Sequence, residues 1–241
     1  MKAMLLAAGK SSRLPEACRY GSKVLVPVRG QTLLERNLRY LRRSGIREAV
    51  INLCHGKKAI LAFLKRKRMF GMKLLFSFEK EPLGTAGGVK KAQKYLAKGD
   101  FLVLYADNLC DFDLKALLKI HRARRALGTL GVFHPARAVH SGIFAGTLRT
   151  GPEGIVEAFV EKRGGQRIND REVVNAGVAL FSPRIFRRIP SGKFCDFARH
   201  VYPKLLRGRK GLFAVEGASY VLASDTPKAF KRTRRLAAKV L

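Results

Sequence analysis

The sequence predicts an α/β fold, in which a Rossmann-like, mostly parallel sheet is flanked by helices and carries a smaller, partly antiparallel layer. Short aliphatic or β-branched runs alternate with longer helical patterns through the first half of the chain, which is typical of a parallel sheet covered by helices. After Gly128, strand-like runs follow one another with little helix between them. The 241 residues, 47% of them hydrophobic, are enough for one substantial core.

Strands and helices alternate in the first half. The apolar run of residues 2–8 predicts a buried first strand that ends in a turn at Gly9. The strands expected here are residues 2–8, 49–53, 73–78 and 101–105, and the helices are residues 32–44, 57–68, 85–96 and 114–125. This order predicts parallel strands whose carboxyl ends share the edge where open α/β sheets place their ligands.

The second half has a different pattern. Strands are expected at residues 142–148, 155–161 and 173–181, and final helices at residues 196–206 and 227–240. The strand-rich segment favours the smaller, partly antiparallel layer. Because no repeat or low-complexity linker separates the halves, residues 1–241 are predicted to form a single domain.

The amino terminus does not have the pattern of a secretory signal. Residues 3–8 form an apolar run that is shorter than the ~7–15 residues of a signal core, and residues 9–13 are too polar for a cleavage region. No stretch reaches the ~18 uninterrupted apolar residues of a membrane span. The four cysteines are widely spaced and form no C-x-x-C pair. We therefore expect a soluble, cytoplasmic protein with reduced thiols.

The composition is strongly basic. The 49 Lys and Arg residues against 17 Asp and Glu residues give a formal net charge of +32, which attracts phosphates, nucleic acids and anionic membrane surfaces. The charges are spread along the chain without the interleaved aromatic residues of a nucleic-acid module. Non-specific polyanion binding is therefore a secondary hypothesis. The five histidines lack the spacing of a metal site.

The first candidate site is the glycine turn in "LLAAGKSSR". A turn at Gly9 exposes backbone N–H groups that can hold a phosphate, with Lys and Arg neutralising the remaining charge. It is not a Walker loop, which requires glycine where Met4 stands, nor a dinucleotide G-x-G-x-x-G turn. Taken alone, it also fits an ordinary strand-to-loop turn.

A second motif makes the pattern specific. "LAAGKSSRL" followed ten residues after the arginine by the lysine of "SKVLVPV" resembles the signature of the sugar-1-phosphate nucleotidyltransferases, or nucleotide-sugar pyrophosphorylases. The family pattern is G-x-G-T-R followed by P-K, and Ser11, Ser12 and Ser22 stand here for glycine, threonine and proline. The Ser-Ser-Arg variant also resembles the molybdenum-cofactor guanylyltransferases, so this motif leaves the subfamily open.

Further stretches follow in the family's order. "EKEPLGTAGGVKKA" resembles the base-contacting segment, "YADN" and "SDTPKAF" resemble the metal segments, and "VEKRG" and "VNAGV" resemble the sugar site. The resemblance extends over almost the whole chain and is closest to the short mannose-1-phosphate guanylyltransferase-like members. It implies a nucleotide-binding half, about residues 1–127, and a sugar-binding half with the C-terminal helices, about residues 128–241.

The resemblance implies that Asp107 and Asp225 hold Mg²⁺. Nucleotidyl transfer joins two anionic species, so the site needs a divalent cation and fixed positive charges. It does not need a covalent nucleophile. Asp107 follows the apolar run "FLVLY", at the carboxyl end of a predicted parallel strand. Two carboxylates with water and phosphate oxygens suit Mg²⁺. The alternative for Asp225 is a cap for the helix that opens at Thr226-Pro227.

The implied catalytic set is Asp107 with three basic residues. By motif position, Arg13 is expected to grip the β- and γ-phosphates through its planar guanidinium. Lys23 is expected to face the α-phosphate or the sugar phosphate, and Lys162 to hold the sugar phosphate from the other side. The family often has proline after this Glu-Lys pair, where Arg163 stands.

The implied sugar-binding residues are Glu161 and Asn175, through hydrogen bonds to hydroxyl groups, and Gly177, which lets the sugar ring approach the backbone.

The implied nucleotide-binding residues lie at the first turn and at the base segment. The backbone of Ala7, Ala8 and Gly9 is expected beside the nucleotide, and the base near Glu79 and Gly84. A carboxylate only accepts hydrogen bonds, which suits the adjacent donors of guanine better than the mixed pattern of uracil or thymine.

These observations predict Mg²⁺-dependent transfer of a nucleotidyl group from a nucleoside triphosphate, with GTP favoured, to a sugar 1-phosphate, with a mannose or heptose type favoured. Thymidylyl or uridylyl transfer to a hexose 1-phosphate is the nearest alternative. Cytidylyl transfer to phosphocholine ranks lower, because that family lacks a segment like "PLGTAGG". A non-catalytic relative that binds nucleotides or polyanions is an alternative of another class, and homodimer formation stays open.

Overall fold

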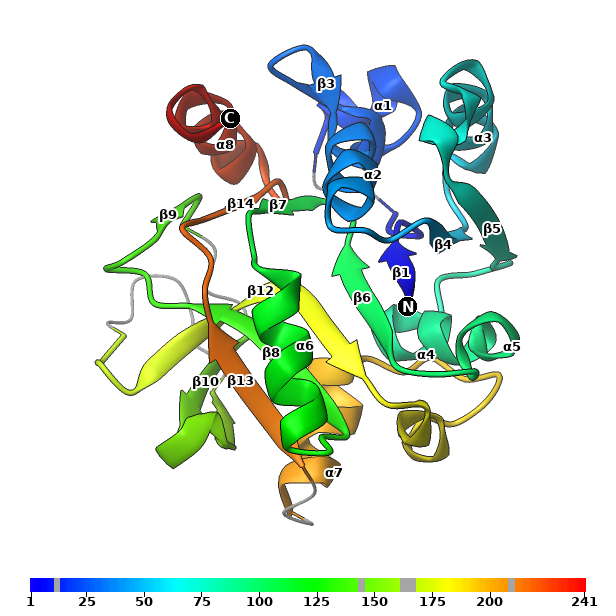
Figure 1. Cartoon of the computed structure of the whole chain (residues 1–241). Helices are drawn as coiled ribbons and strands as arrows, with labels where there is room; N and C mark the ends of the chain where they lie inside the picture. Colours follow the sequence, from blue (N-terminus) through cyan, green and yellow to red (C-terminus); the bar gives the residue numbers. More distant parts are fainter. Residues whose placement is uncertain (11–13, 143–145, 161–167, 208–210) are drawn as a thin grey trace.

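One continuous sheet runs through the middle of the protein (Figure 1). The structure, a computed structural model, describes residues 1–10, 14–142, 146–160, 168–207 and 211–241. Within these ranges, nine strands form the sheet in the order β11-β10-β12-β6-β1-β4-β5, with β8 beside β12 and β13 beside β8. Helices cover the sheet (Figure 1), and the predicted α/β fold class is confirmed.

The parallel part of the sheet contains four strands. They are β5 (Lys73–Phe78), β4 (Glu48–Leu53), β1 (Lys2–Leu6) and β6 (Phe101–Tyr105). The helices of this half are α2 (Leu33–Arg43), α3 (Lys57–Arg66), α4 (Gly84–Lys91), α5 (Gln93–Leu96) and α6 (Leu114–Ala123). Since β1 pairs in parallel with both β4 and β6, the carboxyl ends of these strands meet at one edge.

Alternate residues of β1 enter two hydrophobic cores on opposite faces of the sheet. Ala3 and Leu5 pack with residues of α2, α3 and α6, whereas Met4 packs with residues of α4, α5 and α7 (Tyr202–Arg207). Burial on both faces explains why the parallel strands are near-continuous apolar runs in the sequence. Among the described residues, no helix combines the length and the apolar content needed to cross a membrane.

The strands of the second half continue the same sheet. β12 (Glu172–Phe181) lies antiparallel to β6 and β8 (Gly128–Phe133), and its first residues pair with β10 (Thr147–Thr150). β11 (Val156–Val160) pairs with β10, and β13 (Leu212–Glu216) lies parallel to β8. β8 and β13 were not predicted from the sequence.

A small separate sheet connects two distant parts of the chain. Its strands are β7 (Asn108–Cys110), β14 (Tyr220–Ala223) and β9 (Val139–His140), and α8 (Pro227–Val240) packs beside it. The pairing of Asn108 with Ala223 brings together the segments that carry Asp107 and Asp225. The remaining short elements are α1 (Glu16–Tyr20), β2 (Pro27–Val28), β3 (Gln31–Thr32), the 3-10 helices η1 (Lys23–Leu25), η2 (Arg68–Gly71), η3 (Pro152–Gly154) and η4 (Pro183–Arg188), and the π-helical turn η5 (Phe197–Val201).

Several predicted elements have different ends in the structure. The helix predicted at residues 85–96 is interrupted at Ala92 and forms α4 and α5. The helix predicted at residues 196–206 starts as the π-helical turn η5, and the Asp196 side chain caps this turn by accepting from the N–H groups of Ala198 and Arg199. Of the strand predicted at residues 142–148, β10 contains only Thr147 and Leu148, and residues 143–145 lie outside the described ranges.

Candidate active site

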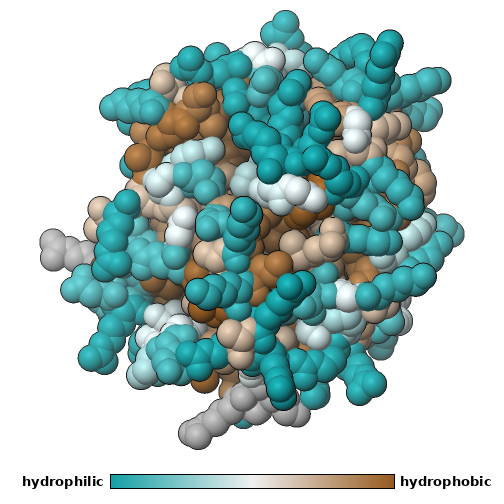
Figure 2. Space-filling model, in the orientation of Figure 1, coloured by the Kyte–Doolittle hydropathy of each residue, from teal (hydrophilic) through white to brown (hydrophobic). Residues whose placement is uncertain are grey.

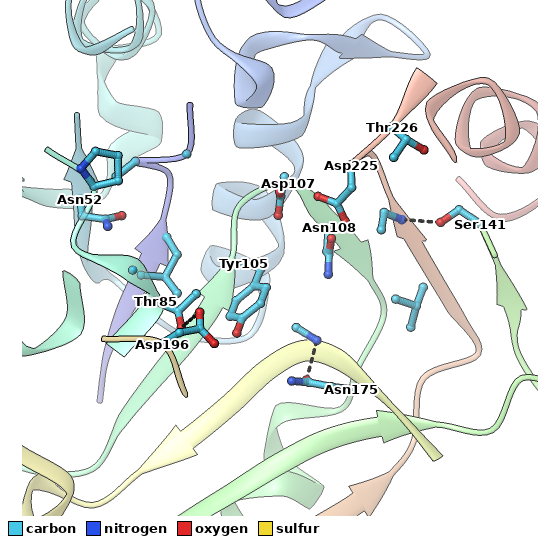
Figure 3. A pocket seen from close by; sticks show the side chains of 18 of the residues that line it. Asn52, Thr85, Tyr105, Asp107, Asn108, Ser141, Asn175, Asp196, Asp225 and Thr226 are labelled. Atoms are coloured by element: carbon cyan, nitrogen blue, oxygen red, sulfur yellow. Dashed lines mark hydrogen bonds between the residues drawn. The ribbon is translucent and has the colours of Figure 1, made fainter. Parts of the chain in front are cut away.

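A cavity of about 470 Å³ opens at the carboxyl ends of the parallel strands. Its wall contains residues from β1, β4, β6, β12 and β14, from the start of α4 and from the turn before α8. Figure 3 shows side chains from these separate segments around a common space. Because open α/β sheets bind ligands at this edge, the cavity is the candidate active site.

Two carboxylates and one ammonium group meet in this site. Lys23 Nζ donates to Asp107 Oδ2 at 2.7 Å and to Asp225 Oδ1 at 2.6 Å. Asp107 follows β6 and Asp225 lies between β14 and α8, and their side chains are neighbours in Figure 3. The structure thus brings together the two acids that the sequence predicted as metal ligands. Lys23, the residue expected at a phosphate, lies between these two acids.

Burial and charge have opposing effects on this cluster. Burial lowers the pKa of the Lys23 ammonium, but attraction to Asp107 and Asp225 outweighs it, so the pKa of Lys23 is raised above its ordinary value. Burial raises the pKa of the Asp225 carboxyl, the charge of Asp107 raises it further, and Lys23 opposes both effects. The two carboxylates therefore need a cation between them, and Lys23 supplies it here.

Asp225 does not cap the helix that follows it. Thr226 Oγ1 accepts from the Ala229 N–H at 3.2 Å, and Pro227 is the first residue of α8. Thr226 therefore has the capping role that the sequence left open for Asp225. The carboxylate of Asp225 is directed to Lys23 instead.

The donor set suits a divalent cation whose coordination is completed by a substrate. Carboxylate oxygens of Asp107 and Asp225 lie 2.7 and 2.6 Å from one cationic position, that of Lys23 Nζ. Mg²⁺ is commonly held by one or two carboxylates together with water and substrate phosphates. Within the described ranges, no group of three or more His, Cys, Asp or Glu side chains could hold a metal ion. The two carboxylates fit a Mg²⁺ ion that would take its other ligands from water and a substrate.

A buried chain of hydrogen bonds joins the ends of β1, β4 and β5. Asn52 Oδ1 accepts from the Ala7 N–H, and Asn52 Nδ2 donates to Glu79 Oε1, both at 2.7 Å. Glu79 Oε2 accepts from the Leu83 N–H at 2.9 Å. Both Glu79 oxygens thus act as acceptors. The N–H of Ala7 is committed to Asn52, whereas Glu79 lines the cavity.

The first turn of α4 is held by the chain before η5. The N–H groups of Ala86 and Gly87 donate to the Cys195 carbonyl at 3.0 and 2.9 Å, and the Cys195 N–H donates to Leu83 O at 2.8 Å. Gly84, which lines the cavity, has a φ of 77°, and a Cβ there would lie 2.5 Å from the Cys195 carbonyl oxygen. The predicted base segment therefore requires glycine at this position for a conformational and a steric reason.

Gly88 gives a direct test of the Asn52–Glu79 contact. A Cβ at Gly88 would lie 2.7 Å from Asn52 Nδ2 and 2.9 Å from Glu79 Oε1. Gly88→Ala is therefore expected to lower the free energy of unfolding by about 1–3 kcal/mol, the usual cost of overpacking. Gly99→Ala is the control, because nothing lies within 4 Å of a Cβ at Gly99. Urea denaturation should separate the two variants, and equal stability would contradict the tight packing.

The long strand β12 carries a β-bulge where it passes the cavity. Its pairing with β8 shifts register between Asn175 and Val178, and Gly177 has a φ of 78°. The Gly177 N–H donates to Asn175 Oδ1 at 2.9 Å (Figure 3). A Cβ at Gly177 would lie 2.5 Å from Asn108 Nδ2 and 3.2 Å from Tyr105 Cβ. The bulge thus places the predicted Asn175 and Gly177 on the cavity wall.

A further polar cluster lies on the wall near α4 (Figure 3). Thr85 Oγ1 donates to Asp196 Oδ2 at 2.8 Å and accepts from the Phe197 N–H at 2.9 Å. Tyr105 lies nearby, and burial raises the pKa of its phenol. Thr85, Tyr105, Asp196 and Asn52 were not predicted as site residues. Thr85 stands inside the base segment and Tyr105 inside "YADN", but the family motifs assign no role to either position.

The cavity wall is acidic, although the protein is strongly basic. Among the described residues that line it, none is Lys or Arg, whereas the whole chain has a net charge of +32. The carboxylates on the wall are Glu79, Asp107, Asp196 and Asp225. Figure 2 shows hydrophilic side chains distributed over the visible face of the molecule. The excess of basic residues therefore lies outside the described residues that line the cavity, and two of the wall carboxylates, Asp107 and Asp225, are paired with Lys23.

The remaining predicted site residues fall into two groups. Ala8 and Gly9 lie on the cavity wall. Arg13, Glu161 and Lys162 lie outside the described residues.

The nucleotidyl transferase family model matches residues 2–220 of the chain. A UTP–glucose-1-phosphate uridylyltransferase from Synechocystis is 30% identical over 226 residues, covering 89% of this chain and 58% of that protein. The mannose-1-phosphate guanylyltransferase of Mycobacterium tuberculosis is 29% identical over 231 residues, covering 95% of this chain and 62% of that protein. The chain thus spans about three fifths of the length of these curated relatives.

Solved structures share the fold. HddC from Yersinia pseudotuberculosis is 24% identical, with a TM-score of 0.80 over 97% of this chain and 98% of that chain. A second HddC structure, complexed with GMP-PN, has a TM-score of 0.78 and covers 98% of this chain and 99% of that chain. A UDP-glucose pyrophosphorylase from Acinetobacter is 17% identical, with a TM-score of 0.76 over 99% of this chain and 93% of that chain.

Proposed function

The chain belongs to the nucleotidyl transferase family, and from this premise we propose that it transfers a nucleotidyl group from a nucleoside triphosphate to a sugar 1-phosphate, releasing pyrophosphate and forming an NDP-sugar. The observation that carries the proposal is the convergence of Asp107 and Asp225 on one cationic position inside a cavity at the carboxyl edge of the sheet. Two anionic substrates can react there only if their charges are neutralised, which is the role of a cation site.

In the proposed reaction, an oxygen of the sugar 1-phosphate attacks the α-phosphorus of the triphosphate in line. The new P–O bond forms as the bond to pyrophosphate breaks, and pyrophosphate leaves with the electron pair. Mg²⁺, when bound by Asp107 and Asp225, supplies neutralising charge at the phosphate oxygens. The Lys23 ammonium is proposed to pair with the α-phosphate when the triphosphate is bound. The roles of Arg13 and Lys162 at the phosphates rest on the family resemblance alone.

The positions of the other wall residues suggest how the substrates lie. The nucleotide is proposed to follow the turn at Ala8 and Gly9, with the base towards Glu79. The sugar is proposed to lie against the bulge of β12, where Asn175 and Gly177 line the cavity. The Glu161 role in sugar binding rests on the resemblance.

We propose GTP as the nucleotide and a mannose- or heptose-type 1-phosphate as the acceptor. Both oxygens of Glu79 accept hydrogen bonds, and guanine presents adjacent donors along one edge. The similar HddC structure complexed with GMP-PN contains a guanine nucleotide, and a mannose-1-phosphate guanylyltransferase is among the relatives. The uridylyltransferase relative keeps uridylyl or thymidylyl transfer to a hexose 1-phosphate as the alternative.

Glu79→Gln tests the choice of base. Glutamine replaces one of the two acceptor oxygens by an NH2 donor group, so one of the contacts to Asn52 and Leu83 is lost and the acceptor pair proposed for the base is incomplete. We expect kcat/KM for GTP to fall about 10- to 100-fold, in line with the ~1.5–3 kcal/mol of a hydrogen bond to a charged group, and to fall less for UTP. Glu81→Gln, at an exposed position of the same loop, is the control. Equal losses with both nucleotides would remove the argument for guanine.

The overall proposal is tested by a matrix of four nucleoside triphosphates against several sugar 1-phosphates, assayed for pyrophosphate with and without Mg²⁺. We expect the highest turnover with GTP and a mannose- or heptose-type 1-phosphate, and none without a divalent cation. Absence of turnover with every pair, together with retained nucleotide binding, would favour a non-catalytic relative.

A further inference from the structure

The connection that carries Asp107 is held from the side of helix α2. Asn37 Nδ2 donates to the Ala106 carbonyl and to the Asn108 carbonyl, both at 3.0 Å. Asn37 itself is 2% exposed, so this amide spans a buried gap between α2 and the connection from β6 to β7. The two carbonyl groups belong to the residues immediately before and after Asp107.

This amide fixes the backbone at the point from which the Asp107 side chain projects. A buried carbonyl that loses its donor is destabilised, so the backbone would reorient to find another partner. Rotation of the peptide at either side of Asp107 would move its carboxylate relative to Asp225. Because a cation has to be shared between two carboxylates, a small rotation at one of them is enough to spoil the pair.

Helix α2 provides a rigid base for this contact. The Thr32 side chain caps it by accepting from the Glu35 N–H at 3.0 Å, and Leu34 and Leu38 are fully buried in the core. One turn after Asn37, the Tyr40 hydroxyl donates to the Phe112 carbonyl at 2.6 Å. The same helix thus makes a second hydrogen bond to the chain beyond β7, at a greater distance in sequence from Asp107.

We propose that Asn37 is a positioning residue for metal binding, which holds the backbone on both sides of Asp107 so that its carboxylate can share a cation with Asp225. The inference rests on the proposed function, in which these two acids bind the metal. It assigns to Asn37 an effect on metal affinity, whereas Tyr40 is assigned an effect on stability alone.

The experiment compares Mn²⁺ binding, alone and with GTP but without sugar phosphate, by the electron paramagnetic resonance signal of free Mn²⁺. Asn37→Ala is expected to weaken Mn²⁺ binding about 10- to 100-fold, as substitutions behind metal ligands commonly do. Tyr40→Phe is the matched control, because it also removes one donor of α2 to a carbonyl of this region, and its Mn²⁺ affinity should equal that of the wild type. Both variants are expected to lower Tm.

Asp107→Asn separates failure of this inference from failure of the proposed function. If the wild type and Asp107→Asn bind Mn²⁺ equally, the metal site itself is wrong. If only Asp107→Asn loses binding and Asn37→Ala binds as the wild type does, Asn37 has a structural role and our inference is overturned.

A second variant covers the case in which Asn37→Ala does not fold. Asn37→Ser retains one donor, so an intermediate Mn²⁺ affinity is expected. An affinity equal to that of the wild type would contradict the proposed positioning role of Asn37. Turnover gives an independent readout, because excess Mg²⁺ should restore the activity of an Asn37 variant but not that of Asp107→Asn.

Discussion

Asp107→Asn is expected to reduce Mg²⁺-dependent pyrophosphate release by about 10²–10³-fold or more while the protein stays folded, a loss similar to that of other transition-state charge stabilisers. The amide has nearly the shape of the carboxylate but no charge, so one of the two anionic donors that share the cationic position is removed. Lys23 keeps its contact with Asp225, which limits the structural consequence. Steady-state pyrophosphate release over a range of Mg²⁺ concentrations, together with circular dichroism, measures both parts of this prediction.

Asp113→Asn provides the matched control for Asp107→Asn. Asp113 lies a few residues further along the chain and caps α6 by accepting from the Lys115 N–H at 2.8 Å. Asparagine is as good a capping residue as aspartate, so this variant should keep its activity and stability. If Asp107→Asn retained full turnover, or if both variants lost it equally, the proposed catalytic role of the acid pair would be wrong.

The parallel half of the fold could be predicted because its strands are buried on both faces. Such strands are short continuous apolar runs, and each is followed by a helical stretch, so β4, β5 and β6 were predicted with errors of at most one residue. The second half offered a weaker pattern. Its strands do not alternate with helices, and the position of each strand depends on partners from distant parts of the chain.

Strand β8 was not predicted because it contains glycines. These glycines are required by close packing against β12 and do not mark a turn. Glycine in a strand usually indicates a turn or a bulge, and the prediction treated Gly128 as the start of a new region. In the structure, a Cβ at Gly131 would lie 2.2 Å from Val178 Cγ1, and one at Gly128 would lie 2.9 Å from the Phe181 ring. These contacts come from β12, far along the chain, so the local sequence does not reveal them.

The meeting of Asp107 and Asp225 could be anticipated, because family motifs marked both residues and a strand end marked the first. The side-chain amides that support the site, those of Asn52 and Asn37, could not be anticipated. Asn52 binds the N–H of Ala7, 45 residues earlier, and Asn37 binds carbonyl groups 69 and 71 residues later. A buried amide whose partners are backbone atoms has no sequence motif, since any residue type can provide those atoms. The position of Lys23 likewise depends on two carboxylates, those of Asp107 and Asp225, that lie far away in the sequence. No spacing rule describes such a contact.

Lys23→Met is expected to destabilise the metal-free protein and to make its stability depend strongly on Mg²⁺. Removing one partner of a buried ion pair costs ~3–5 kcal/mol. The two carboxylates are 28% and 27% exposed, so solvent screening reduces the expected loss to about 2 kcal/mol. Since Mg²⁺ can take the position between the acids, it should raise the Tm of this variant more than that of the wild type, in which Lys23 competes for the same place. Thermal unfolding with EDTA and with Mg²⁺ measures the difference.

Lys2→Met separates this effect from the general loss of a lysine. Lys2 pairs with Glu48 at 2.9 Å, away from the cavity, so the Tm of this variant should respond to Mg²⁺ as the wild type does. Activity provides a second distinction, because Lys23→Met should bind Mg²⁺ at least as well as the wild type and yet release pyrophosphate slowly for want of the ammonium group at the α-phosphate. If Mg²⁺ does not change the Tm of Lys23→Met, Asp107 and Asp225 only form ion pairs with Lys23 and do not bind a metal.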